Sequence, residues 1–443
     1  MRKPFSICLL FAACSLHGAD LNVGVGRRVI TPEQQPVWLA GYAARTTPST
    51  GMIHHVWAKA LVFEEPPSNR VAFITVDVLG LSREIVQAVT SRLQTRYGFE
   101  RSQVFVNSSH THSAPPVWPC LSICYSFTQQ EKQAVAAFNV RLADALLGAV
   151  ETAMTNLAPA RVASGRGSAG FAVNRRTFDV KPVDHDVPVV RVTAPDGGVR
   201  AVLFGYACHN TTLTGNNLLL NGDYAGFAQI ELEKACPGAT ALFLQGCAAD
   251  QNPSPRGTVE LAQQYGRELA GAVQRVLSGE MRPVRAPLRT CFLETRLDFP
   301  PLDLEQLRHD FMGADVFKQR RAEFVLSAFN KGNPIASIPY PVQAVRFGDD
   351  LSVLALSGEV VVDYSRRAKR EYAAENLIVA GYCNEVQCYI PSARVLREGG
   401  YEANESMIYY GLPGPFAEHV EESVFGAVRQ VMKRVGVESA TGE

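Results

Sequence analysis

The stretch Val104-Phe-Val-Asn-Ser-Ser-His-Thr-His-Ser-Ala-Pro115 decides how the rest of the chain is interpreted. Its apolar beginning is typical of a β-strand, which runs into a polar loop carrying His110 and His112. Two histidines one residue apart, just after a strand, can direct both imidazoles into one pocket. Imidazole is a zinc ligand and a proton carrier near neutral pH. The HxH pattern is short, so it predicts a metal site only together with other residues.

The segments before this loop predict a βαβ unit. Arg70–Asp77 is a continuous apolar strand, Ser82–Tyr97 has apolar residues at helical spacing, and Gln103–Asn107 is the second strand. Such units form parallel sheets, whose ligands bind outside the carboxyl ends of the strands. The histidine loop therefore lies where a ligand site is expected.

Two more candidate ligands follow apolar strands far along the chain. His209 comes after the predicted strand Val199–Ala207, and Glu359 comes after Leu351–Leu356. If these strands share a sheet with the strand before His110, all three side chains converge on one rim. Two imidazoles and one carboxylate, with a position left for water, form the open ligand set of hydrolytic zinc.

The remaining pattern predicts an α/β fold: a mixed, partly parallel central sheet with flanking helices in a single large domain. Hairpins are expected around Ala194–Gly198 and Gly348–Asp350. The other main predicted segments are strands at Leu21–Ile30, Val56–Glu64, Ala160–Gly167, Ala239–Gln245 and Asn376–Tyr382, and helices at Glu131–Leu157, Tyr224–Cys236, Thr258–Leu277, from Ser357 to Tyr372, and Pro415–Val435.

The charge composition argues against two classes of binding partner. The 43 basic and 43 acidic residues cancel, so no broad attraction to nucleic acid or to an anionic membrane is indicated. In an oxidising compartment the local pairs Cys120/Cys124 and Cys383/Cys388 can bridge, or all four can be buried free thiols.

The N-terminus predicts export. Arg2-Lys3, an apolar run from Phe5 to Leu16 and the small pair Gly18-Ala19 form a signal-peptide pattern over residues 1–19. The apolar run is too short to span a bilayer. We therefore expect residues 20–443 to be secreted or periplasmic, without a lipoprotein anchor or transmembrane segment, and with at most peripheral membrane contact.

These residues together resemble the neutral, non-lysosomal ceramidase family. Its Ser-His-Thr-His-Ser-Gly-Pro motif is matched except at Ala114. Further matching positions are Asn174-Arg175, His209 with the Asn-Gly-Asp turn at 221–223, Gly358-Glu359, Tyr389, and Tyr401 twelve residues later. The resemblance runs from about residue 21 to 435 and does not include the family's C-terminal immunoglobulin-like domain.

The resemblance implies roles for seven residues. His110, His209, Glu359 and Tyr389 would ligate Zn²⁺. His112, Arg175 and Tyr401 would contact the substrate or the oxyanion. Without the resemblance, Arg175 is more simply a surface cation and Tyr401 a core aromatic.

One position departs from the family. Where the ceramidases carry a serine in an Asp-x-Ser-Pro turn, this chain has Asn252 in Asp250-Gln-Asn-Pro253. Asparagine is not a nucleophile, although its amide can donate a hydrogen bond to an oxyanion. The sequence therefore favours direct attack by zinc-activated water, with His112 or another group moving the proton to the leaving amine.

The leading hypothesis is a secreted zinc-dependent amidohydrolase that cleaves the amide bond of ceramide or of another small or lipid N-acyl compound. Two alternatives remain open. One is a zinc-binding relative that acts as a binding protein, and the other is a zinc esterase or phosphodiesterase on the same scaffold.

Overall fold

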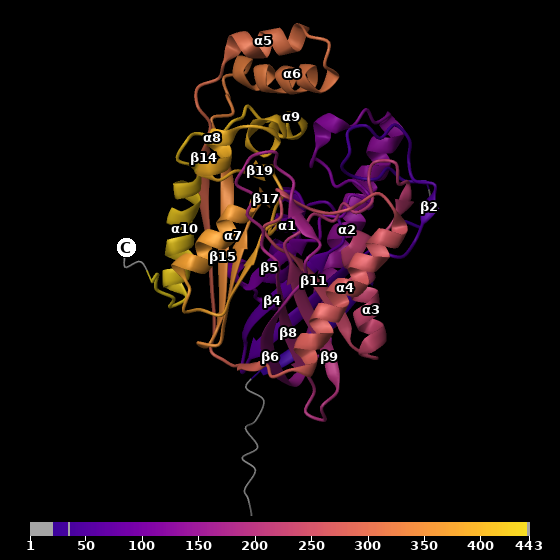
Figure 1. Cartoon of the computed structure of the whole chain (residues 1–443), viewed down its shortest axis with the longest axis vertical. Helices are drawn as coiled ribbons and strands as arrows, with labels where there is room; N and C mark the ends of the chain where they lie inside the picture. The colour runs from indigo at the N-terminus through magenta and orange to yellow at the C-terminus, as the bar shows by residue number, and fades with distance from the viewer. Residues whose placement is uncertain (1–20, 34–35, 441–443) are drawn as a thin grey trace, which may run out of the picture.

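Two β-sheets pack face to face, and helices cover both outer faces (Figure 1). The computed structural model describes residues 21–33 and 36–440, so the predicted signal peptide lies outside the described residues. The predicted α/β fold with a mixed sheet and flanking helices is confirmed.

The larger sheet has the order β11-β9-β8-β6-β1-β3-β4-β5, with β13 paired to β6. The pairs β4/β5 and β9/β11 are parallel, and the other pairs are antiparallel. Its strands are β1 (Leu21–Val29), β3 (Trp57–Glu65), β4 (Asn69–Val76), β5 (Val104–Ser108), β6 (Ala158–Ser168), β8 (Asp186–Thr193), β9 (Val199–Tyr206), β11 (Thr240–Gln245) and β13 (Arg282–Val284).

The smaller sheet has the order β14-β15-β16-β18, in which only β16/β18 is parallel. Its strands are β14 (Leu288–Asp298), β15 (Ser337–Phe347), β16 (Leu351–Leu356) and β18 (Leu377–Ala380). Three short pairs complete the strands: β2 (Gly51–Met52) with β10 (Leu219–Leu220), β7 (Ala172–Asn174) with β12 (Gln251–Pro253), and β17 (Glu359–Val360) with β19 (Tyr389–Ile390).

The helices fall into three groups. Those on the larger sheet are α1 (Arg83–Tyr97), α2 (Gln129–Thr155), α3 (Asp223–Ala235) and α4 (Val259–Ser278). Those on the smaller sheet are α7 (Val362–Glu371) and α10 (Val420–Arg434). The others are α5 (Leu304–Met312), α6 (Val316–Asn330), α8 (Ala393–Glu398), α9 (Met407–Tyr410) and the short turns η1 (Arg101–Gln103), η2 (Ser122–Cys124) and η3 (Tyr401–Glu405).

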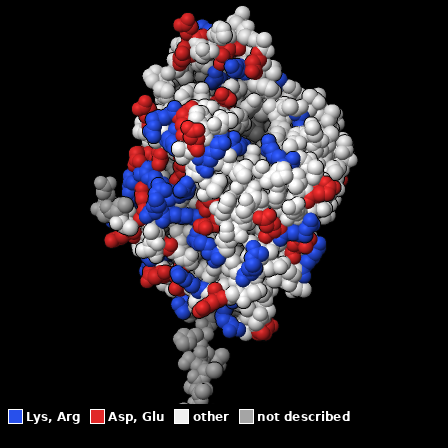
Figure 2. Space-filling model, in the orientation of Figure 1, with Lys and Arg blue, Asp and Glu red and all other residues white. Residues whose placement is uncertain are grey.

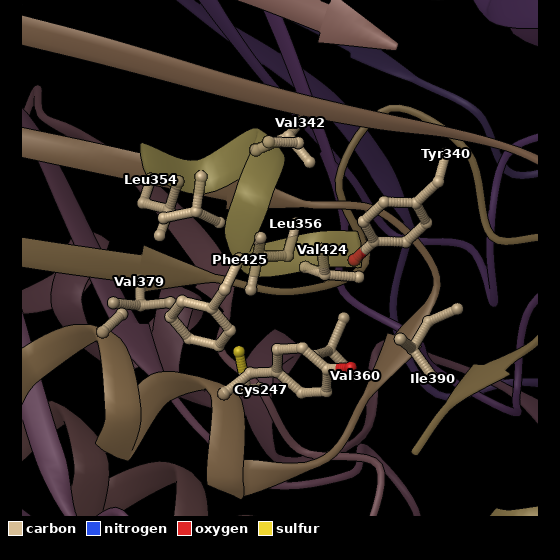
Figure 3. Close-up of a cluster of buried hydrophobic side chains, with 14 of the residues drawn as sticks. Cys247, Tyr340, Val342, Leu354, Leu356, Val360, Val379, Ile390, Val424 and Phe425 are labelled. Atoms are coloured by element: carbon tan, nitrogen blue, oxygen red, sulfur yellow. The ribbon is translucent and has the colours of Figure 1, made fainter. Parts of the chain in front are cut away.

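Strand alternation builds the layers. Phe105 of β5 belongs to the core between the sheets, whereas Val104 and Val106 belong to the core beneath α1 and α2. Phe63 and Phe347 meet across the two sheets with ring centroids 5.1 Å apart. On the far side of the smaller sheet, Phe425 of α10 packs among strand side chains (Figure 3). Every layer thus has an apolar neighbour.

Helix α2 is the one described helix that is long and apolar enough, by length and composition alone, to cross a membrane. Its N-terminus has a capping box between Thr128 and Glu131. Half of its most apolar window is buried inside the fold, where it packs on α1 and the larger sheet. This packing accounts for its apolar face without a membrane.

The larger sheet curls so that its two end strands, β5 and β11, come together through Asn107. The Asn107 Oδ1 accepts from the Gln245 N–H (2.8 Å), and its Nδ2 donates to the carbonyls of Gln245 (3.2 Å) and Gly381 (2.7 Å). Since β9 neighbours β11, this curl brings the segments after β5 and β9 to the same place.

The convergence was argued on the condition that the strands before His110, His209 and Glu359 share one sheet, and β16 does not meet that condition because it lies in the smaller sheet. The helix predicted to begin near Glu359 instead begins at Val362. Glu359 is held extended because its strand pairs with β19, and the Val362 N–H donates to the buried Asp250 carboxylate (2.8 Å).

All eight cysteines in the described part of the chain are free thiols, and six of them are buried. Of the two alternatives for Cys120/Cys124 and Cys383/Cys388, the structure has the unbridged one.

Candidate metal centre and cleft

Three side chains from distant parts of the chain point their reactive atoms at one another. The Oε2 of Glu359 lies 3.2 Å from the Nε2 of His110 and 3.2 Å from the Nε2 of His209. The Nε2 of His112 lies 3.1 Å from that of His110, and one ring nitrogen from each of the three histidines lies within 4.8 Å of the other two. The residues expected at one rim are therefore together.

The tautomers of the two buried histidines are set by main-chain carbonyls. The Nδ1 of His110 lies 2.6 Å from the Leu79 oxygen, and that of His209 lies 2.7 Å from the Ala248 oxygen. A carbonyl only accepts, so each Nδ1 carries the proton and each Nε2 presents a lone pair.

These lone pairs face an anionic oxygen. The Oε2 of Glu359 is buried and has no hydrogen-bond partner among the described residues. Two imidazole lone pairs and one carboxylate oxygen repel one another unless a cation lies between them. Imidazole with carboxylate is a donor set that suits Zn²⁺, and carbonyl partners on the remote nitrogens are the usual support of such ligands. The residues present fit a divalent metal.

The other oxygen of Glu359 is held by Tyr410, whose hydroxyl donates to Oε1. Gly358, with φ of 79°, fits where an added Cβ would lie 2.8 Å from the Cys388 carbonyl oxygen. Glu359 is thus held in a fixed position.

The histidine loops are fixed by the main chain. His110 has φ of 63°, a left-handed conformation that is uncommon away from glycine, and its N–H donates to the Val78 carbonyl (3.0 Å). The loop after His209 is held by buried Asp223, whose carboxylate accepts from the N–H groups of Thr212 (3.1 Å) and Leu213 (2.9 Å). The turn at 221–223 thus supports the His209 loop.

Burial lowers the pKa of His209 to about 4, with Arg175 as the next cause. Burial likewise lowers the pKa of His112, and His110 and His209 add to the effect. Both imidazoles are therefore neutral at pH 7, which is the form that binds metal.

Tyr389 lies beside this group. Its hydroxyl is 3.3 Å from the Nε2 of His209, and its strand pairs with that of Glu359. The Nη2 of Arg175 donates to the same hydroxyl (3.1 Å). A phenol oxygen in this position can become a fourth ligand.

Arg175 is half-buried and held in an ion pair rather than free at the surface. Its Nε donates to Glu402 (2.8 Å), and its guanidinium carbon lies 5.4 Å from the centroid of the Tyr401 ring. Tyr401 is 38% exposed and lines the cleft, so it is not a core aromatic. The structure thus places Arg175 and Tyr401 in the same cleft as His209 and Glu359.

A cleft of about 560 Å³ opens over these groups. It lies beneath the α5–α6 hairpin, where Figure 2 shows a hollow. Its lining includes Gly41, Tyr42, Leu121, His112, Arg175, Phe178, His209, Thr211, Asn252, Arg256, Glu359, Tyr389, Tyr401, Glu402 and Tyr409. A second cavity of about 550 Å³, between Val29–Trp38 and α2, contains none of the predicted site residues. Convergent polar groups make the first cleft the candidate site.

Asn252 lies on β12 at the cleft wall. Its Oδ1 faces the hydroxyl of Thr211 (3.4 Å) and the Nη1 of Arg175 (3.5 Å). It lies among the metal-site residues and, as an amide, offers hydrogen bonds but no nucleophile.

Sequence reasoning missed Tyr410, Glu402 and Gly41. An added Cβ on Gly41 would lie 2.1 Å from the His112 ring, so only glycine fits there. For Glu402 a weak signal existed, because the Arg175-Arg176 pair needs an acidic partner if it is buried. Glu402 accepts from both arginines.

The comparisons agree with this arrangement. Residues 21–259 match the family model described as neutral/alkaline non-lysosomal ceramidase, N-terminal. Neutral ceramidase of Pseudomonas aeruginosa is 23% identical over 94% of this chain and 73% of that protein. Neutral ceramidases of Drosophila pseudoobscura pseudoobscura and Mycobacterium tuberculosis are 28% and 26% identical, over 52% and 54% of this chain but only 34% and 41% of theirs.

Solved structures show the same fold. The crystal structure of the Pseudomonas aeruginosa neutral ceramidase superposes with a TM-score of 0.73 at 19% identity, over 95% of this chain and 75% of that one. A ceramidase described as complexed with C2 gives 0.74 at 18% identity, over 96% and 77%.

Proposed function

Because this chain belongs to the neutral/alkaline non-lysosomal ceramidase family, we propose that it is a zinc-dependent amidohydrolase that cleaves an N-acyl amide bond. The observation that carries the proposal is the convergence of Nε2 of His110 and Nε2 of His209 on Oε2 of Glu359, each at 3.2 Å. The names of the relatives supply the bond type, since a ceramidase cleaves an amide.

His110, His209 and Glu359 would hold the ion, with Tyr389 as a fourth ligand. Bound there, zinc supplies Lewis acidity for the amide carbonyl and for water at neutral pH. Around it, Arg175 and Tyr401 are placed to donate to the carbonyl oxygen as it becomes negative.

The same geometry suggests a route for proton transfer from water to the leaving nitrogen. Water adds to the carbonyl carbon and gives up both its protons, the carbon–nitrogen bond breaks, and the leaving nitrogen takes both protons, so the products are a carboxylate and an ammonium group. The Nε2 of His112 faces the metal group, 3.1 Å from the Nε2 of His110, so it is placed to pass the proton of water to the leaving nitrogen. With Asn252 in place of a hydroxyl, the reaction needs no covalent intermediate.

The test measures zinc per chain and fatty acid release from an N-acylsphingosine, with and without a chelator. We expect chelator-sensitive release that added zinc restores. Glu359→Gln should lose metal and at least about 100-fold of activity. The matched control Glu280→Gln, at an exposed residue outside the cleft, should lose neither.

A Glu359→Gln protein that kept one zinc per chain would show that the ligand assignment is wrong. A wild-type protein that held zinc but cleaved no amide would contradict the amidase activity and leave the metal site standing.

We also propose that residues 1–19 direct export and that residues 20–443 act as a single catalytic domain outside the cytoplasm, on a small or lipid substrate and not on nucleic acid. The charged, apolar and small-residue pattern of the N-terminus supports export. N-terminal sequencing of protein recovered from the medium or periplasm tests it, and a cytoplasmic chain that kept Met1 would contradict it.

A further inference from the structure

The cleft carries a cation that the proposed reaction does not use. Arg256 lines the cleft on the same wall as Asn252, four residues further along the chain. Burial raises the pKa of the Tyr42 hydroxyl, and the charge of Arg256 lowers it, as do the charges of Arg45 and Arg175. Tyr42 itself packs on the His112 ring with centroids 4.8 Å apart. Arg256 is exposed, so its guanidinium is accessible at the edge of the cleft.

The loop that bears Arg256 is fixed on both sides. The Ser254 N–H donates to the Phe171 carbonyl (3.1 Å), and the Gly257 N–H donates to the Thr212 carbonyl (2.7 Å). Between them, the Tyr265 hydroxyl donates to the Pro255 carbonyl (2.6 Å). These hydrogen bonds hold the backbone of residues 254–257 in place at the edge of the cleft.

The other cations of the cleft are already paired. Glu402 pairs with Arg175 at 2.8 Å and with Arg176 at 2.7 Å, and Glu398 pairs with Arg176 at 3.0 Å. Arg256, in contrast, has no ion pair or hydrogen bond within residues 21–33 and 36–440. With the carboxylate of Glu359 facing the metal position, the cleft rim keeps a positive charge that no acidic side chain in the described part of the protein pairs with.

Asn252 adds a donor on the same wall. Its Oδ1 is turned toward Thr211 and Arg175, so its NH₂ group points away from them, and that nitrogen has no partner among the described residues. An unpaired amide donor near an unpaired guanidinium matches a carboxylate better than a neutral hydroxyl.

We propose that the substrate carries a negative charge near the scissile amide, and that Arg256, assisted by Asn252, binds it. The favoured class is an N-acyl amino acid, in which the leaving amine bears a carboxylate, rather than a neutral N-acyl amino alcohol. This inference rests on the proposed amidase function and names its substrate class.

The experiment compares two substrates with the same acyl chain: an N-acylglycine, and the N-acylethanolamine that has a hydroxymethyl group in place of the carboxylate. Both are assayed with the zinc-loaded wild type and with Arg256→Gln, Arg256→Lys and the control Arg267→Gln. Arg267 is exposed on α4, outside the cleft.

For the wild type we expect kcat/KM to favour the N-acylglycine, chiefly through KM, with a preference that weakens at high salt. Arg256→Gln should reduce the preference at least about tenfold by raising KM for the N-acylglycine alone, since a charge-assisted hydrogen bond is lost. Arg256→Lys should keep part of the preference, and Arg267→Gln all of it. Equal losses on both substrates, or a wild type that prefers the neutral one, would overturn the inference.

A binding measurement separates this inference from the proposed function. If neither of these substrates nor the N-acylsphingosine is hydrolysed, the amidase proposal fails, and calorimetric titration of the N-acylglycine into the zinc-loaded wild type and Arg256→Gln still decides the anion site. Weaker binding to Arg256→Gln alone supports the site, and equal or absent binding refutes it.

Discussion

Tyr410 fixes the carboxylate on which the metal group depends. Its hydroxyl donates to Oε1 of Glu359, which leaves Oε2 to face His110 and His209. Groups that orient a metal ligand in this way commonly have a large effect on metal affinity. Tyr410 is a positioning residue, since it acts through Glu359.

Tyr410→Phe should weaken zinc binding by about 10- to 100-fold, because the carboxylate loses the partner that orients it. Competition with a chromogenic chelator measures the dissociation constant. Tyr340→Phe is the matched control, since that buried hydroxyl has no hydrogen-bond partner among the described residues. Unchanged zinc affinity in Tyr410→Phe would show that the main chain alone positions Glu359.

At this scale the sequence predicted the side chains that stand at strand ends. His110, His209 and Glu359 each follow an apolar run, and this position can be recognised from the sequence alone. Tyr410 gives no such signal, because it lies 51 residues from Glu359 and only tertiary packing brings the two together. The same holds for Glu402, which is 227 residues from Arg175.

Among the elements, the contact between the two end strands of the larger sheet determines whether the site forms. The loops after β5 and β9 come together because Asn107 bridges β5 to β11. Asn107 is completely buried, and its removal leaves the N–H of Gln245 without its partner. The Gln245 carbonyl still accepts from the Gly381 N–H (3.1 Å), and the Gly381 carbonyl still accepts from the Cys383 thiol (3.2 Å). An unsatisfied buried polar group costs about 1–3 kcal/mol.

Asn107→Ala should therefore lower the free energy of unfolding by about 1–3 kcal/mol and weaken zinc binding as well. Denaturant unfolding and the chelator competition measure the two effects. Asn156→Ala is a matched control: Asn156 bridges the N–H and C=O of Val25 (2.8 and 2.7 Å) far from the cleft, so its loss should reduce stability alone. Zinc affinity that fell equally in both variants would contradict a specific role for Asn107.

Element types could be predicted, but strand partners could not. Apolar periodicity gave the βαβ unit from β4 to β5 and the hairpin of β8 and β9, since each depends on neighbouring sequence. It did not show that β16 belongs to a second sheet, because an apolar strand buried on both faces looks the same in either sheet. The convergence on one site was right, although the single-sheet premise for β16 was wrong.

In the molecule as a whole, the candidate ligands come from both sheets. His110 and His209 follow strands of the larger sheet, whereas Glu359 and Tyr389 lie on the β17/β19 pair after strands of the smaller one. A bound ion would therefore connect the two halves of the central core. Such a connection exists only in the folded state.

Metal removal should accordingly lower the melting temperature. At a free zinc concentration 1,000-fold above its dissociation constant, binding stabilises the folded state by about 4 kcal/mol. Calorimetry with and without chelator measures the shift, and Glu359→Gln should show little of it. An equal chelator effect in wild type and Glu359→Gln would place the stabilising ion elsewhere.

The carbonyl oxygens of Leu79 and Ala248 also have a kinetic consequence. A free neutral imidazole exchanges its proton between two nitrogens, and a ligand that starts with the wrong one must first tautomerise or rotate. Here both buried rings hold the proton on Nδ1 before any ion arrives. An incoming ion therefore displaces no proton from the imidazole of His110 or His209, and neither ring has to rotate before it can bind the ion.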